Sequence, residues 1–189
     1  MIAAAMVALK NAGTALVEVE APALDTGRLN ADNDVQKYEF KALLNAYLAA
    51  ISNAPAKSLA DIIASGKFHK PSLEKFLSSA ESFANGMEEP DYQERLLRNQ
   101  RTRQVLSSVF AEHKLDALVY PLQKRLTVPL TEFNQADRNG ILASVTGFPA
   151  ITVPAGFSSP TATAPLGVPV GMDILGKPWS EGRLIELDV

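Results

Sequence analysis

The sequence of 189 residues contains no cysteine. This absence excludes disulfides, thiolate catalysis and zinc–thiolate sites. Histidine is almost as rare, and its two copies, His69 and His113, are far apart and lack the spacing of metal ligands. Surface or helix-end positions account for both of them. We therefore expect no metal site.

Glycine-rich catalytic motifs are also missing. No two glycines are adjacent, and the sequence contains no G-x-S-x-G elbow, no G-x-G-x-x-G fingerprint and no P-loop. The one S-x-x-K match runs from Ser72 to Lys75, directly after Pro71. We interpret Ser72 as a helix cap and Lys75 as a solvated side chain, with an independent enzyme built on these two residues as an alternative. We expect no cofactor and assign no catalytic residue in this chain.

The chain has no strong charge of either sign. Its formal net charge is −3 and its pI is near 5.4, which gives no electrostatic reason to expect nucleic acid or an anionic membrane as a partner. Four arginines cluster at Arg95, Arg98, Arg101 and Arg103, without interleaved aromatic residues and just after several acidic ones. This pattern indicates a solvated helix face.

Two apolar stretches raise the question of a membrane. The first, "MIAAAMVALKNAG", lacks the basic region of a signal peptide and is interpreted as a helix. The second, residues 139–172, carries no charge, but five prolines interrupt it, so we predict buried strands and a loop rather than a membrane span. With no cysteine, these features favour the cytoplasm.

The order of elements predicts a single domain of the α/β class over residues 1–189. Residues 2–20 are expected to form a helix that ends at Gly13 and a strand in which Val17 and Val19 alternate with glutamates. A helical block at about 34–113 follows, with a capping box opening at Ser58 and a later helix starting near Pro90.

The region 116–189 is dominated by short apolar runs. Residues 116–121, 149–154 and 168–176 predict strands of a sheet covered by helices on both faces. Between the first two runs, "RNGILASVTG" predicts a short helix closed by Gly147. Residues 158–167 are expected to be a surface loop, and a last helix is expected to open at Ser180.

The segments "DALVYP", "RNGILASVTGFPAITVPAGF" and "LGVPVGMDILGKPWSEGRLIEL" together resemble the C-terminal third of amidase signature hydrolases. The resemblance implies part of a layered α/β/α fold around a mixed sheet, and hydrolysis of amides without metal or cofactor. The family uses a nucleophilic serine, a second serine in a cis peptide, and a lysine. These lie in an earlier Gly/Ser-rich loop and lysine-bearing strand, and no residue of this sequence matches those positions.

The resemblance also implies one wall of a substrate pocket, at Asn134, Asp137 and Ile141. Their i, i+3, i+7 spacing would place them on one helical face if the helix starts that early. The alternative is that Ile141 belongs to the core and the two polar residues cap the helix. Gly147, Pro149 and Pro154 are expected to be structural: Gly147 permits a tight turn, and the prolines restrict pairing at the ends of a strand.

Two functions remain open on these grounds. The chain is either the C-terminal portion of an amidase, inactive alone, or a non-catalytic binding or interaction module descended from one. As a portion of an amidase, it would pair with a complementary N-terminal half, or with a second copy of itself, through an exposed sheet edge.

Overall fold

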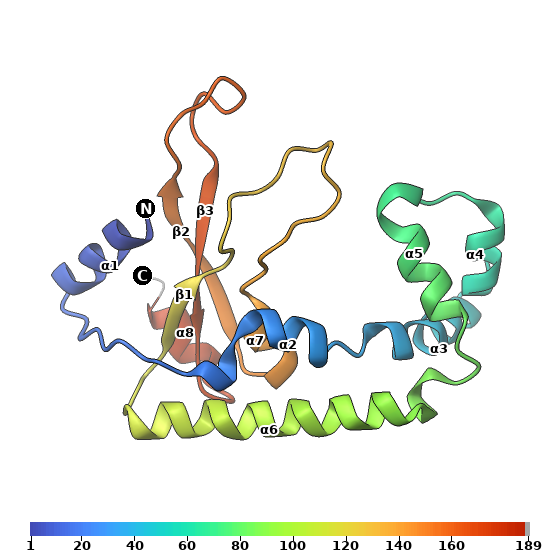
Figure 1. Ribbon diagram of the computed structural model, residues 1–189, viewed down its shortest axis with the longest axis horizontal. Helices are drawn as coiled ribbons and strands as arrows, with labels where there is room; N and C mark the ends of the chain where they lie inside the picture. Colours follow the sequence, from blue (N-terminus) through green and yellow to red (C-terminus); the bar gives the residue numbers. More distant parts are fainter. Residues whose placement is uncertain (188–189) are drawn as a thin grey trace. The chain divides into compact units, whose positions relative to one another are not determined.

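The computed structural model describes residues 1–187, which form two compact units (Figure 1). The sheet unit comprises Met1–Ala31, Asn99–Pro129 and the chain from Gln135 onward. The helical unit comprises Asp32–Arg98 and Leu130–Asn134. Among the described residues, no helix combines the length and the apolar composition that a membrane crossing requires.

The sheet unit contains one antiparallel sheet in the order β1-β3-β2, with β3 at its centre. Its elements are α1 (Ile2–Asn11), the 3-10 turn η1 (Pro22–Leu24), most of α2 (Thr26–Asp32), the second part of α6 (Pro90–Glu112), β1 (Leu118–Pro121), α7 (Ile141–Thr146), β2 (Ala150–Phe157), β3 (Pro169–Leu175) and α8 (Glu181–Leu187). The expected α/β class and the three expected strands are confirmed. All pairings in this sheet are antiparallel.

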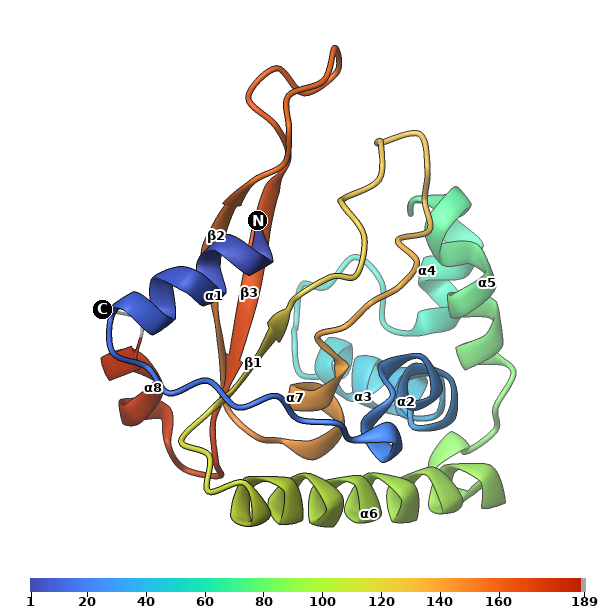
Figure 2. The same ribbon diagram turned by 60° about the vertical axis from the view of Figure 1, so that its left-hand side comes forward.

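Pairing register decides which side chains of the sheet face the core. Tyr120, Asp173 and Thr152 lie opposite one another across the three strands. Since side chains alternate along a strand, they share one face with Leu175, which is fully buried. That face contributes to the core of the unit, formed by Leu24, Leu29, Leu106, Val109, Phe110, Leu142, Phe148 and Leu175. Figure 2 shows α7 on one side of the sheet, and α1 and α8 on the other.

Helix α7 ends as the sequence predicts. Gly147 adopts a left-handed backbone (φ 70°), and its N–H bonds to the carbonyl of Ala143 at 2.7 Å. Glycine adopts this conformation without the Cβ clash that other residues meet. Pro149 precedes β2 as expected, whereas β2 continues through Pro154 to Phe157. The proline is tolerated inside this strand because β2 lies at the edge of the sheet.

The strand expected at the end of residues 2–20 is wrong. Residues 14–20 adopt no regular structure, and no strand among the described residues pairs with them. Val19 nevertheless packs against the core, while Val17 is 56% exposed. The alternation therefore reflects one-sided burial, because a strand also needs a neighbouring backbone to complete its hydrogen bonds.

The helical unit is built from α3 (Gln36–Ala49), α4 (Leu59–Ser65), α5 (Lys70–Glu81), the turn η2 (Gly86–Glu88) and the first part of α6. Leu59, Leu77 and Ala80 form its small core, and Phe40 packs edge-to-face on Phe76 beside them. The predicted N-cap of α4 is confirmed, since Ser58 Oγ accepts the N–H of Asp61 at 3.1 Å. The expected helical block at 34–113 thus spans this unit and continues along α6 into the sheet unit.

Candidate functional site

The segment that leads into α7 is not helical. Ile141 is the first residue of α7, whereas Asp137 has a left-handed backbone (φ 57°) and an exposed side chain 3.8 Å from Arg125. Asn134 is also exposed and lies outside any helix. The three residues predicted for the pocket wall therefore do not share a helical face. The helix starts late because the N–H groups of Asn139 and Gly140 both bond to the carbonyl of Leu122.

Asn139 connects the entry of α7 to two other parts of the sheet unit. Its side chain is buried, its Nδ2 donates to the carbonyl of Pro121 at 2.7 Å, and its Oδ1 accepts from the Thr26 hydroxyl at 2.9 Å. These bonds connect the end of β1, the start of α2 and the start of α7. Sequence reasoning missed Asn139. The available signal was an amide next to Gly140, at the start of the uncharged stretch 139–172.

Asp173, on the central strand β3, lies close to the start of α7. It is 4% exposed on the central strand, and Thr152 Oγ1 donates to its Oδ1 at 2.6 Å. A Cβ added to Gly140 would lie 3.2 Å from Asp173 Oδ2 and 2.8 Å from a methyl of Leu122. The absence of a side chain at Gly140 therefore lets the entry of α7 approach the carboxyl closely.

Burial changes the pKa of the Asp173 carboxyl. Desolvation raises the pKa of Asp173, and the hydrogen bond from Thr152 opposes part of that rise. The hydroxyl of Tyr120 is buried without a hydrogen-bond partner among residues 1–187. Desolvation, and then the charge of Asp173, raise the pKa of Tyr120. Both shifts favour the neutral forms of the two groups relative to the same groups in water.

The hydrogen bonds of the serines in the described chain distinguish Ser72 from the others. Most of the hydroxyls that make hydrogen bonds, such as those of Ser107 and Ser144, bond to backbone groups. Ser72 is different, since its Oγ lies 2.8 Å from His69 Nδ1. His69 is the N-cap residue of α5, so the interpretation of Ser72 as the cap is wrong. The His69 ring meets the Phe133 ring edge-to-face, and no carboxylate is hydrogen-bonded to His69 among the described residues.

Metal ligands do not converge in the part of the chain that the structure describes. No group of three or more histidine, aspartate or glutamate side chains there is arranged to hold a metal ion.

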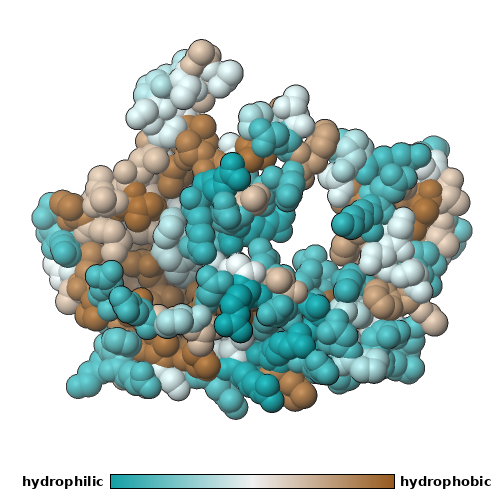
Figure 3. All heavy atoms as spheres, in the orientation of Figure 1, coloured by the Kyte–Doolittle hydropathy of each residue, from teal (hydrophilic) through white to brown (hydrophobic). Residues whose placement is uncertain are grey.

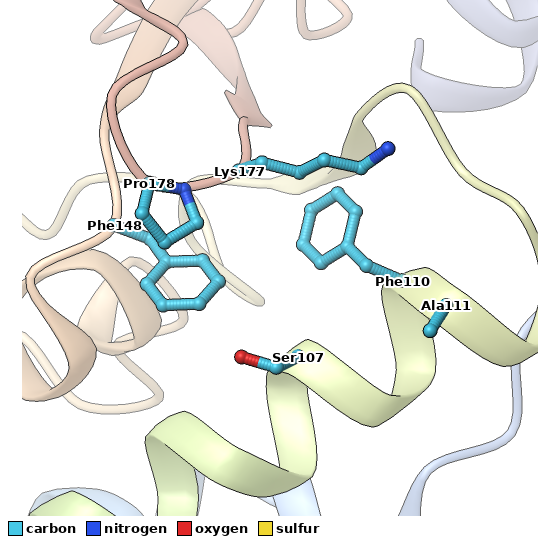
Figure 4. A pocket seen from close by; sticks show the side chains of 6 residues that line it. All are labelled: Ser107, Phe110, Ala111, Phe148, Lys177 and Pro178. Carbon is cyan, nitrogen blue, oxygen red and sulfur yellow. The ribbon is translucent and has the colours of Figure 1, made fainter.

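A cleft of about 290 Å³ opens on the sheet unit (Figure 4). It is lined by Ser107, Phe110 and Ala111 of α6, by Phe148, and by Lys177 and Pro178 after β3. The rings of Phe110 and Phe148 lie 6.2 Å apart, while the Lys177 ammonium extends past Phe110 (Figure 4). This cleft is apolar with one cationic edge.

The sheet unit is an α/β arrangement of one antiparallel sheet with helices, and comparison with known proteins identifies its family. Residues 1–185 match the model of the Amidase family. The chain is 31% identical to a peptide amidase from Stenotrophomonas maltophilia of known structure, with a TM-score of 0.78 over 99% of this chain and 37% of the other. The chain therefore belongs to the amidase family.

Curated relatives agree with this assignment. A probable amidase from Arabidopsis thaliana is 32% identical over 156 residues, which are 79% of this chain and 26% of that protein. Mandelamide hydrolase from Pseudomonas putida is 35% identical over 42% of this chain and 16% of that enzyme. The chain thus spans about a quarter or less of these relatives.

Proposed function

We propose that this chain is the C-terminal portion of an amidase domain that hydrolyses amide C–N bonds, and that it supplies scaffold and one pocket wall rather than the nucleophile. The observation that carries the proposal is the match of 99% of this chain to only 37% of the peptide amidase. The serine and the lysine would then come from family segments that these 189 residues do not contain. Its partner would be the complementary N-terminal part of such a domain.

The wall would be formed by the start of α7, with Ile141 at its first position. Asn139 and Asp173 would hold this wall in place without touching the substrate, because both are buried. The N–H of Asn139 bonds to the carbonyl of Leu122, and the carboxyl of Asp173 lies close to Gly140. Asn134 and Asp137 would reach a substrate only as side chains of the preceding loop. The cytoplasmic location expected from the sequence stays a prediction.

The absence of a nucleophile is tested on the purified chain. A serine-reactive fluorophosphonate probe should label no serine; in support, Ser72 lies 2.8 Å from His69 Nδ1, but no carboxylate is hydrogen-bonded to that histidine among residues 1–187. Ser72→Ala is the informative variant, since Ser72 alone contacts a ring nitrogen. Labelling that disappears in this variant, with amide turnover by the pure chain, would contradict the proposal.

The amidase role is tested by exchange. The matched C-terminal portion of the Stenotrophomonas maltophilia peptide amidase is replaced by this chain within one polypeptide, and amide hydrolysis is measured. We expect hydrolysis that depends on the host's catalytic segment and is absent from the host without any C-terminal portion. A folded but inactive chimera would favour the non-catalytic module instead.

A further inference from the structure

Trp179 is the only tryptophan of the sequence, and it is almost completely exposed, at 93%. Its backbone is left-handed (φ 64°), a conformation that bulky residues adopt at a cost. An exposed aromatic ring on a sparsely populated backbone conformation suggests a functional role for this residue. Figure 3 shows apolar residues gathered on the part of the surface that carries α1 and the strands.

The cleft described above begins one residue before this tryptophan, at Pro178. Its volume of about 290 Å³ is at the lower end of ligand sites, which start near 300 Å³. It therefore suits one large apolar side chain. Phe110 and Phe148 offer ring faces and edges with which a third aromatic ring can pack (Figure 4).

The charges around Trp179 are self-complementary. Lys177 lies two residues before it and Glu181 two residues after it, and neither has an ion-pair partner within the described chain. If two copies of the segment 177–181 run antiparallel about Trp179, Lys177 of each copy faces Glu181 of the other. A twofold interface requires this property, because the same patch must complement itself.

We propose that residues 177–181 form a self-association site, at which Trp179 of each copy fills the cleft of the other copy and Lys177 pairs with Glu181 across a twofold axis. Anchor and cleft are adjacent on the surface, so both insertions fall near the axis. Two tryptophans bury roughly 150–250 Å² each, which is well below the roughly 1,200 Å² of a stable interface. The dimer is therefore weak and depends on concentration. It goes beyond the amidase function and does not depend on it.

The single tryptophan makes the test direct, because its fluorescence reports only on residue 179. Over a dilution series of the full chain, emission should be blue-shifted at high concentration and move to that of a solvated indole on dilution. Sedimentation equilibrium over the same range should show dimer converting to monomer. Invariant emission, or a monomer at every concentration, would overturn the proposal.

Charge reversal tests the arrangement. Lys177→Glu and Glu181→Lys should each weaken the dimer about tenfold, because each creates two like-charge contacts in a twofold assembly. The double variant should recover the original affinity, since the pair is then reversed on both sides. Single reversals without effect, or a double variant that is no better than either single one, would refute the twofold pairing.

Trp179→Ala should abolish the dimer without affecting the fold, because the side chain is 93% exposed. Circular dichroism and thermal unfolding of this variant check the fold. Phe133→Ala removes another exposed aromatic ring, which is 53% exposed and lies in the helical unit, and should leave dimerisation unchanged. A dimer that persists in Trp179→Ala would contradict the assignment of this site.

Discussion

The hydroxyl of Thr152 donates a 2.6 Å hydrogen bond to Asp173 Oδ1 across the neighbouring strands β2 and β3. The carboxyl is buried, and no ion pair reaches it within the described chain. A buried carboxylate with a hydroxyl donor and no cation is only partly compensated for lost hydration. The folded state therefore favours the protonated acid more than the unfolded state does.

Asp173 makes stability depend on pH in a defined direction. Burial raises its folded pKa above the unfolded value of about 3.9. The folded state then binds more protons, so this contribution to stability is fully present below the unfolded pKa and is lost as pH rises through the folded pKa. In Asp173→Asn that loss should vanish. Urea unfolding of both proteins from about pH 3 to about pH 8 measures the difference.

The matched control is Asp137→Asn, because the Asp137 side chain is 55% exposed. Its replacement should change the free energy of unfolding by no more than about 0.5 kcal/mol. If Asp173→Asn follows the parent chain at every pH, the carboxyl does not titrate as its burial requires.

A second prediction concerns the bond between Thr26 and Asn139. Asn139→Ala should destabilise the sheet unit by about 2–4 kcal/mol, because it leaves the buried Thr26 hydroxyl and the half-buried Pro121 carbonyl without their partner. Thr26→Val removes the same bond from the other side. The two changes should therefore be non-additive in a double-mutant cycle, by about 1 kcal/mol.

Asn134→Ala is the control for this cycle. Asn134 is exposed, so its removal should change stability by no more than about 0.5 kcal/mol. Additive effects of Thr26→Val and Asn139→Ala would show that the two side chains do not act as one unit.

The elements that the sequence predicted well are those with local signals. Ser58 caps the start of α4, Gly147 closes α7, and the three apolar runs form the three strands. Each of these signals lies within the element or within a residue or two of its ends. The strand predicted at residues 14–20 is absent because alternation of apolar and polar residues reflects burial of one side only and does not supply a neighbouring strand to pair with.

The support of the candidate site could not be predicted in this way. Thr26 and Asn139 are 113 residues apart, and Asp173 meets Thr152 only through the register of β2 and β3. Such contacts depend on tertiary packing, which one sequence does not reveal. The helical face expected for Asn134, Asp137 and Ile141 assumed a longer α7, and two backbone bonds to Leu122 begin that helix later.

A third prediction concerns the helical unit, where Gly86 lies against the backbone of Tyr38. A Cβ at Gly86 would be 2.2 Å from the Tyr38 carbonyl oxygen and 2.7 Å from its Cα. Because backbone atoms cannot move aside, Gly86→Ala should lower the free energy of unfolding by at least about 2 kcal/mol. Thermal or urea unfolding gives the value.

Gly182→Ala serves as the matched change, because no atom lies within 4 Å of an added Cβ in α8. It should be neutral or stabilise by up to about 1 kcal/mol, as alanine is favoured over glycine in helices. Equal effects at the two glycines would show that the contact with Tyr38 is not the cause.

A fourth prediction concerns Asp91, whose pKa is held below its usual value. The Tyr38 hydroxyl, which donates to Oδ2, is the larger cause, and Arg95, at 3.0 Å, is the next. In Tyr38→Phe the hydroxyl is gone, so the pKa of Asp91 should rise toward its ordinary value. Carbon-detected NMR titration of the carboxyl groups measures this directly.

Asp61 is the internal reference in the same titration, because its pKa is lowered first by the Lys57 N–H and then by Ser58, and Tyr38 takes no part. Its titration should be identical in both proteins. The sign for stability also differs from that of Asp173. A group whose folded pKa is depressed contributes stability above its unfolded pKa, and that contribution is lost as pH falls through the folded pKa. Tyr38→Phe should therefore lose less stability on acidification than the parent chain. An unchanged Asp91 titration would mean that Arg95 alone sets its pKa.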